Sequence, residues 1–177
     1  MFSRYTFVTH WRVKATCEEV FEVLSDALGL KRWWPSVYLD VTELQPGDPD
    51  TGVGREIELY TKGWLPYTLR WSFTITETRR PHGFSLEPHG DFEGSGVWTL
   101  SQDGEWCDIQ YDWRIEAGKP LLRVLSPFMK PLLAANHRWS MARGEESLSL
   151  ELERRHAPDA AARARVPAPP GPTFTKR

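Results

Sequence analysis

Apolar residues in this chain follow a period of two, then a helical period, then a period of two again, and finally a helical period. This order restricts the possible folds more than any other feature of the sequence. Residues 5–15 alternate between apolar and polar side chains, which predicts a strand with one buried face. Residues 16–29 have helical spacing, with Thr16 and Glu19 at capping-box separation and Gly29 as a C-cap. A strand followed by a short amphipathic helix is therefore expected first.

The middle of the chain is rich in β-forming residues. Clusters of Gly, Pro and Asp divide it, and such clusters are typical of the turns between strands. The six strands predicted here are residues 36–44, 54–62, 65–77, 83–89, 92–101 and 106–116. Together with the first strand they make seven, and the short connections favour antiparallel hairpins.

The period becomes helical again after Pro120. The residues that share the apolar side of this last helix are Leu133, His137, Ser140, Met141, Gly144, Leu148 and Leu152. A helix over 127–154 would be ~42 Å long, enough to cross a domain. Pro127 and Pro131 are expected to start or kink this helix, which makes the residues before it a separate, irregular segment.

Length and charge limit the classes of protein that fit. The 177 residues suit one domain over 1–156, followed by an Ala-, Pro- and Arg-rich tail over 157–177 that we expect to be disordered. The net charge of −2, without a long basic block, argues against nucleic acid as a partner. No segment reaches the ~18 uninterrupted apolar residues of a membrane span. The first residues lack a signal-peptide pattern, so we expect a cytoplasmic protein.

Five segments carry a resemblance to a known superfamily. They are "THWRVKATCEEVFEVLSD" at 9–26, "WWPSV" at 33–37, "GSGVWTL" at 94–100, "YDWRI" at 111–115 and "NHRWSMARGEESL" at 136–148. In this order they resemble the SRPBCC (START/Bet v 1-like) superfamily, and within it the polyketide cyclase/dehydrase-like bacterial proteins. The resemblance implies an α+β helix-grip fold. In it, a curved seven-stranded antiparallel sheet wraps around a long C-terminal helix, short helices lie between strands 1 and 2, and a cavity remains inside.

The predicted cavity is apolar and aromatic, since the chain has nine tryptophans. The residues expected to line it lie at inward positions of the strands, at the corner before Pro35, or on the last helix. They are Trp11, Trp33, Trp34, Ile57, Leu59, Leu69, Trp71, Phe73, Phe92, Gly94, Gly96, Trp98, Tyr111, Trp113, Leu133, Asn136, His137 and Met141.

Two parts of this prediction have plain alternatives. Trp33 and Trp34 are expected to wall or cap the cavity, but large aromatic side chains also seal ordinary cores. Gly94 and Gly96 leave two inward positions without a side chain, which either makes room for a ligand or only permits curvature or a bulge in the sheet.

His137 is the polar residue with the clearest chemical potential. It lies on the apolar side of the last helix and should face the cavity. There it would bind a ligand carbonyl, or act as a general acid or base with Tyr111 as a candidate partner. The alternative is a core histidine that is satisfied by its neighbours.

Signals for a cofactor or a metal fail on inspection. "GVG" at 52–54 leads into a strand rather than a helix, so it does not predict a phosphate-binding turn. His82 and His89 lack the geometry of a metal site. We therefore predict neither a cofactor nor a metal.

Three functions fit the sequence. The first is binding of a small hydrophobic ligand, lipid-, isoprenoid- or polyketide-like, for transport, sequestration or sensing. The second is a cyclase/dehydratase-type enzyme in which His137, and Tyr111 with it, moves protons. The third is an interaction module that uses the apolar segment 121–133, which is otherwise a lid, a core element or a membrane contact. The sequence leaves the oligomeric state open.

Overall fold

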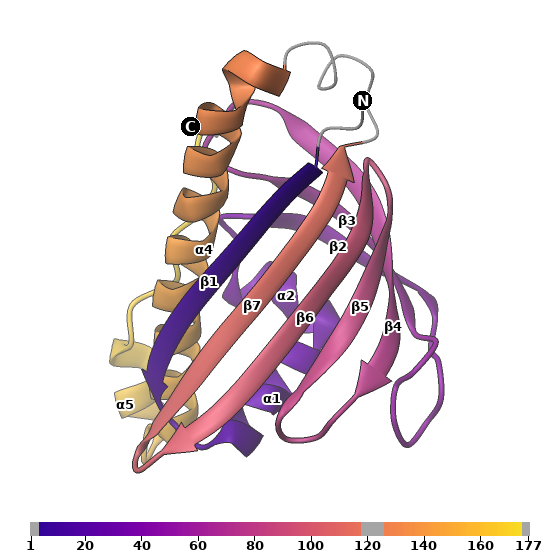
Figure 1. The fold of residues 1–177 in the computed structure, drawn as a ribbon. Coiled ribbons are helices and arrows are strands. Elements are labelled where there is room, and N and C mark those ends of the chain that lie inside the picture. Colours follow the sequence, from indigo (N-terminus) through magenta and orange to yellow (C-terminus); the bar gives the residue numbers. More distant parts are fainter. Residues whose placement is uncertain (1–3, 118–125, 175–177) are drawn as a thin grey trace.

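A computed structural model describes residues 4–117 and 126–174 of the chain (Figure 1). The elements are, in chain order, β1 (Arg4–Lys14), α1 (Cys17–Ser25), a 3₁₀ turn (Ala27–Gly29), α2 (Leu30–Trp33), β2 (Tyr38–Gln45), β3 (Glu56–Lys62), β4 (Thr68–Thr78), β5 (Gly83–Gly90), β6 (Phe92–Asp103), β7 (Trp106–Ala117), α4 (Ser126–His156) and α5 (Ala160–Arg165). The predicted seven strands and long last helix are confirmed.

The strands form one antiparallel sheet in the order β1-β7-β6-β5-β4-β3-β2. Strand β1 pairs with β7 along its whole length, from Arg4 opposite Glu116 to Lys14 opposite Trp106. The first strand therefore closes one edge of the sheet beside the last one. Helix α4 lies along β1 and contacts α1 and α2 (Figure 1). This arrangement confirms the α+β helix-grip fold.

Helix α1 begins with the predicted capping box. The Thr16 hydroxyl accepts a hydrogen bond from the Glu19 backbone N–H, and the Glu19 carboxylate accepts one from the Thr16 N–H. That bond from Thr16 also lowers the pKa of Glu19. One face of the helix buries Val20, Phe21 and Leu24 against the core. Local sequence thus fixes both the start of α1 and its inward face.

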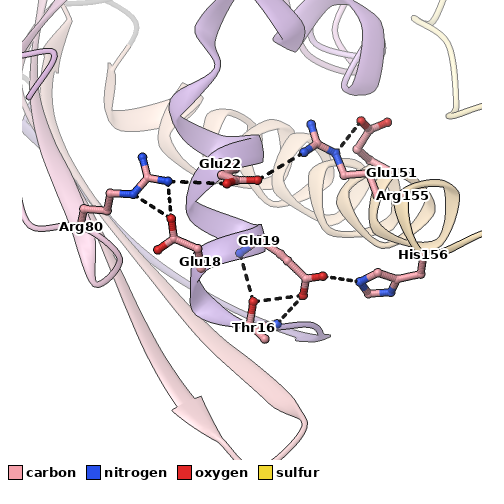
Figure 2. Close-up of polar contacts among 8 residues, drawn as sticks. All are labelled: Thr16, Glu18, Glu19, Glu22, Arg80, Glu151, Arg155 and His156. Carbon is pink, nitrogen blue, oxygen red and sulfur yellow. Dashed lines mark hydrogen bonds and ion pairs between the residues drawn. The ribbon is translucent and has the colours of Figure 1, made fainter. Parts of the chain in front are cut away.

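Charged side chains join α1 to its neighbours on both sides (Figure 2). Arg80, in the connection between β4 and β5, pairs with Glu18 and Glu22 of α1. On the other side, His156 at the end of α4 lies 2.8 Å from Glu19. Each exposed pair contributes little by itself. As a set they tie α1 to the sheet and to the C-terminal end of α4.

The start of helix α4 agrees with its prediction. The helix begins at Ser126, so Pro127 is its second residue, as expected for a proline that starts a helix. The predicted irregular segment does not extend to Pro131, because α4 includes that residue. Pro127 removes no hydrogen bond, since the first four N–H groups have no partner inside the helix, whereas Pro131 is the sixth residue and removes one. Residues 121–125 of the predicted lid segment lie outside the described residues.

The segment that the sequence predicts to be a disordered tail has a defined path as far as residue 174. Asp159 caps α5 by accepting a hydrogen bond from the Ala162 N–H, and Arg154 of α4 donates one to the Pro167 carbonyl. Side chain to backbone bonds of this kind need no apolar residues, so hydrophobic patterning gives no sign of them.

Helix α4 approaches the core closely at Gly144. A Cβ atom added there would lie 2.3 Å from Cζ2 of Trp34 and 2.7 Å from Cζ2 of Trp11. The two indole rings contact each other at a centroid distance of 5.5 Å in an edge-on arrangement, which suits aromatic pairs. Gly144 therefore lets the helix pack directly against two tryptophans.

No helix among the described residues is long and apolar enough to cross a membrane.

Candidate functional site

The described residues enclose two neighbouring pockets between the inner face of the sheet and the helices. The α4 pocket has a volume of about 150 Å³, and the described residues that line it are Tyr5, Phe7, Trp34, Val37, Tyr38, Thr61, Lys62, Gly63, Tyr67, Leu69, Trp71, Phe92, Tyr111, Trp113, Ile115, Leu133, Asn136, His137, Ser140 and Met141. The α1 pocket has a volume of about 360 Å³ and is lined by Phe21, Leu24, Ser25, Ala27, Leu30, Trp34, Tyr38, Asp50, Thr51, Gly52, Arg55, Trp71, Phe73, Ile75, Thr78, Arg80, Phe84, Leu86, Trp98 and Tyr111.

Aromatic side chains shared by both linings separate the two pockets. These are Trp34, Tyr38, Trp71 and Tyr111. Trp34 packs edge-on against Tyr38 at 5.1 Å between ring centroids. The indole N–H of Trp71 donates a hydrogen bond of 3.1 Å to the Thr61 hydroxyl, which fixes the orientation of its ring. The predicted single cavity is therefore divided by an aromatic wall.

Ten predicted cavity residues line the α4 pocket: Trp34, Leu69, Trp71, Phe92, Tyr111, Trp113, Leu133, Asn136, His137 and Met141. Phe73 and Trp98 line the α1 pocket instead. The remaining aromatic and aliphatic candidates line neither pocket and are buried in the packed core; they are Trp11, Trp33, Ile57 and Leu59. The two tryptophans before Pro35 therefore have different roles. Trp33 is part of the packed core, and Trp34 lines both pockets.

Of the two alternatives for Gly94 and Gly96, the neighbouring atoms favour a role within the sheet over room for a ligand. Gly94 has φ of 141°, and a Cβ there would lie 2.0 Å from the Arg114 carbonyl oxygen, so the glycine permits close pairing of β6 with β7. A Cβ at Gly96 would meet Cδ1 of Leu86 and the Tyr111 hydroxyl, each at 2.9 Å. Neighbouring side chains therefore fill the space, and neither glycine lines the α4 or the α1 pocket.

His137 lies on the wall of the α4 pocket as predicted. Its ring stacks on Phe7 of β1 at 4.2 Å between centroids. Its Nε2 atom is buried and has no hydrogen-bond partner among the residues that the structure describes. Burial, and secondarily the nearby charge of Arg138, lowers the pKa of His137 to about 4. The imidazole is therefore neutral at pH 7 and offers one unused polar atom to the pocket.

Tyr111 lies in the aromatic wall, stacked on Trp98 at 4.1 Å between centroids. Burial raises the pKa of Tyr111 well above its ordinary value, and burial also raises the pKa of Tyr38. Both phenols are therefore protonated near neutral pH. They can donate hydrogen bonds to a ligand but are poor bases.

Asn136 has a structural partner that the sequence did not reveal. Its Oδ1 accepts a hydrogen bond of 3.0 Å from the backbone N–H of Leu65, in the connection between β3 and β4. Gly63 makes this approach possible, because a Cβ there would lie 2.4 Å from the same oxygen. Asn136 thus ties α4 to the rim of the pocket.

Several lining residues were not predicted as site residues. Tyr5 and Phe7 of β1 share the inward face with Trp11, so the alternation of the first strand was a sufficient signal for them. Thr61 also follows the inward register of Ile57 and Leu59. Lys62 carried no such signal, because a lysine at a strand end is usually exposed.

Metal ligands do not gather in the described part of the chain. Across residues 4–117 and 126–174, no group of three or more His, Cys, Asp or Glu side chains is arranged to hold a metal ion. Arg55, which has a place in the lining of the α1 pocket, pairs with Glu43 of β2.

Comparison with known proteins agrees with this architecture. Residues 4–149 match the protein family described as polyketide cyclase/dehydrase and lipid transport. No protein of curated function matches the chain in sequence.

Solved structures with a similar fold share little sequence with this chain. The Zhui aromatase/cyclase from Streptomyces sp. R1128 is similar with a TM-score of 0.67 at 19% identity, over 89% of this chain and 98% of its own. The protein TTHA0849 from Thermus thermophilus is similar with a TM-score of 0.64 at 16% identity, over 81% of this chain and 97% of its own. Norcoclaurine synthase from Thalictrum flavum gives a TM-score of 0.58 at 14% identity, over 86% of this chain and 98% of its own.

Proposed function

Since this chain belongs to the polyketide cyclase/dehydrase and lipid transport family, we propose that it binds a small hydrophobic molecule in the space between its sheet and α4. The molecule is lipid-, isoprenoid- or polyketide-like, and binding serves transport, sequestration or sensing. The α4 pocket is the proposed place of its polar end.

One observation carries this proposal. The α4 pocket is a hollow lined largely by aromatic rings, and buried polar atoms of its lining residues have no partner among the described residues: Nε2 of His137 and Nε1 of Trp34. An unsatisfied buried polar atom costs stability, so such atoms are rare without a reason. A ligand that is mostly apolar and carries a polar group would fill the hollow and satisfy one of these atoms.

Extraction of the purified full chain with organic solvent, followed by mass spectrometry, tests the proposal. Ser140→Phe places a ring in the α4 pocket, whereas Ser149→Phe adds the same ring at an exposed position of the same helix. We expect a bound compound with the unaltered chain and with Ser149→Phe, and its loss with Ser140→Phe. Finding no compound after expression in several hosts, or equal loading of both variants, contradicts the proposal.

His137 also supports a second candidate, a cyclase/dehydratase-type enzyme. Its Nε2 has no partner in the described part of the chain, so it would be free to exchange a proton with a polyketide-like substrate. With a pKa of about 4, however, the imidazole is a weak base at pH 7, and Tyr111 is a still weaker source of acid–base chemistry. Binding therefore stands first.

His137→Ala separates the two candidates. For the enzyme we expect turnover to be abolished while ligand affinity falls only a few-fold, since the transition state alone depends on the proton transfer. Equal losses of binding and turnover would mean that His137 only holds the ligand.

A further inference from the structure

Lys62, the last residue of β3, is the cationic residue among the described residues of the α4 pocket. It is only 9% exposed, which is unusual for a lysine. The described residues that line the pocket include no aspartate or glutamate. Within 4–117 and 126–174, no ion pair joins the Lys62 ammonium to a carboxylate. This part of the chain therefore gives the pocket a cation without a counter-ion.

Neutral groups from the C-terminal segment surround this ammonium. It donates a hydrogen bond to the backbone carbonyl of Thr173, and it lies over the ring of Phe174 at 5.2 Å from the centroid. The Thr173 hydroxyl in turn donates to the Trp64 carbonyl at 3.0 Å. Residues 173–174 thus lie beside the connection from β3 to β4, next to Gly63 of the pocket lining.

The Thr173 carbonyl and the Phe174 ring are weaker partners for a buried ammonium than a carboxylate would be. Burial removes water from the charge, and a single carbonyl and an aromatic face replace only part of that hydration. The bond to the Thr173 carbonyl has one charged partner, whereas a bond to a carboxylate adds the Coulomb attraction between two opposite charges, which is stronger where water is excluded. A carboxylate would therefore stabilise Lys62 more than the Thr173 carbonyl does.

The C-terminal segment is also held loosely at this point. The Phe174 side chain is already 71% exposed, so moving it away from Lys62 exposes little additional apolar surface to water. Its φ of 55° lies in the left-handed region, which is unfavourable for a residue with a Cβ atom. Displacing residues 173–174 relieves this conformation and frees the ammonium.

We propose that Lys62 binds the carboxylate of an acidic, otherwise apolar ligand, and that Thr173 and Phe174 occupy this place when no ligand is bound. The inference rests on the proposed function, because it assigns a head group to the molecule in the α4 pocket. The ligand and the C-terminal segment then compete for one ammonium.

A matched pair of probes tests the head group. The probes are 2-naphthoate and its neutral isostere 2-naphthamide, titrated calorimetrically into the full chain. We expect the unaltered chain to prefer the carboxylate by about tenfold, the value of one charge-assisted hydrogen bond. Lys62→Met should abolish this preference, and Lys62→Arg should keep most of it. Lys31→Met, which removes an exposed lysine paired with Asp40 outside both pockets, should leave the preference unchanged.

Variants of opposite sign test the competition. Phe174→Ala removes the ring over the ammonium and should raise the affinity for 2-naphthoate about threefold. Phe174→Asp places a carboxylate beside Lys62 and should lower that affinity about tenfold. Neither variant should change the affinity for 2-naphthamide by a comparable factor. Affinities for 2-naphthoate that are the same in both variants overturn the proposed competition.

The outcomes distinguish this inference from the proposed function. If both probes bind equally and Lys62→Met changes neither affinity, the acidic head group is wrong, but the hydrophobic pocket stands. If neither probe binds the unaltered chain or Phe174→Ala, both the inference and the proposed pocket are contradicted. Thermal unfolding of Lys62→Met, followed by circular dichroism, confirms that any lost preference belongs to a folded protein.

Discussion

The two halves of α4 face the same sheet but meet it in different ways. From Gly144 to His156 the helix is packed, because Gly144 admits Trp34 and Trp11, and Leu148 and Leu152 are buried. From Leu133 to Met141 the helix faces a hollow. The helix is therefore packed against the core where a glycine admits two tryptophan rings, and it borders a pocket in the turns before that glycine.

Charge follows the same division. Glu151, buried in the packed half, accepts hydrogen bonds from Arg32 at 2.7 Å and from Arg155 at 3.2 Å. Burial raises the pKa of Glu151, but the bonds from Arg32 and Arg155 lower it more, so its pKa lies below the ordinary 4.5. Around the hollow half lie instead a buried neutral imidazole and a lysine that has no carboxylate partner among the described residues. In the described residues, the buried carboxylate of the packed half is thus paired with arginines, whereas the lysine beside the hollow half has no carboxylate partner.

The largest expected effect comes from Trp34, which lines both pockets and lies next to Gly144 of α4. Trp34→Ala removes one of the four aromatic side chains between the α4 and α1 pockets and should lower the free energy of unfolding by about 3–5 kcal/mol. Trp106→Ala, at an exposed tryptophan of β7, should cost less than about 1 kcal/mol. Urea denaturation measures both. Equal losses would mean that the interior around Trp34 is not packed.

A second prediction concerns the pH dependence of the hollow half. The pKa of His137 is about 4 in the folded chain and near 6.5 when unfolded, so between these values only the unfolded state binds the proton. Stability should therefore fall by about 3 kcal/mol as the pH drops from 6.5 to 4, and be fully present above 6.5. His137→Gln should remove this part of the loss. Denaturation curves of both proteins at several pH values measure this loss. If the stability of His137→Gln falls with pH as steeply as that of the unaltered chain, the imidazole is not held neutral by burial.

The packed half should respond to a small added side chain. Gly144→Val places atoms where the Trp34 and Trp11 rings already lie and should destabilise the chain by about 2 kcal/mol through overpacking. Ala142→Val, at an exposed position of the same helix, should cost only the small difference in helix propensity. If both substitutions shift the urea midpoint equally, α4 does not pack against Trp34 and Trp11 at Gly144.

The smallest expected effect belongs to Glu151. Glu151→Gln keeps the shape but removes the charge that Arg32 and Arg155 face, and should cost about 1–2 kcal/mol, since both arginines are partly exposed. Because its folded pKa is lowered, this stability is present above about pH 4.5 and is lost in more acidic solution. The acid limb of the stability curve should become shallower in the variant, while the loss that His137 causes between pH 6.5 and 4 is retained.

The order of strands and helices was predictable from sequence because it rests on local rules. Alternation in β1, the capping box at Thr16 and Glu19, and the apolar side of α4 are each visible within a few residues. The inward faces of β4 and β7 follow from the same alternation, and with them five residues of the α4 pocket lining: Leu69, Trp71, Tyr111, Trp113 and Ile115. That these residues bind a ligand stays a prediction.

Other features depend on which segments meet in space. The glycines of β6 looked like room for a ligand, but the space above Gly96 belongs to Tyr111 and Leu86 of neighbouring strands. Gly144 carried no local sign of its role, which exists only because two tryptophans from β1 and the α2 corner converge on it. Lys62 looked exposed and is buried by residues more than a hundred positions later in the chain.

Local periodicity is enough to predict the α+β class, the inward positions of the strands and the side of α4 that faces the sheet, because backbone geometry repeats every two residues in a strand and every 3.6 in a helix. The division of the interior by an aromatic wall, the different places of Trp33 and Trp34, and the contact between Lys62 and Thr173 arise from three-dimensional packing. These depend on the volumes of side chains from distant segments, and local periodicity contains no information about how such volumes add.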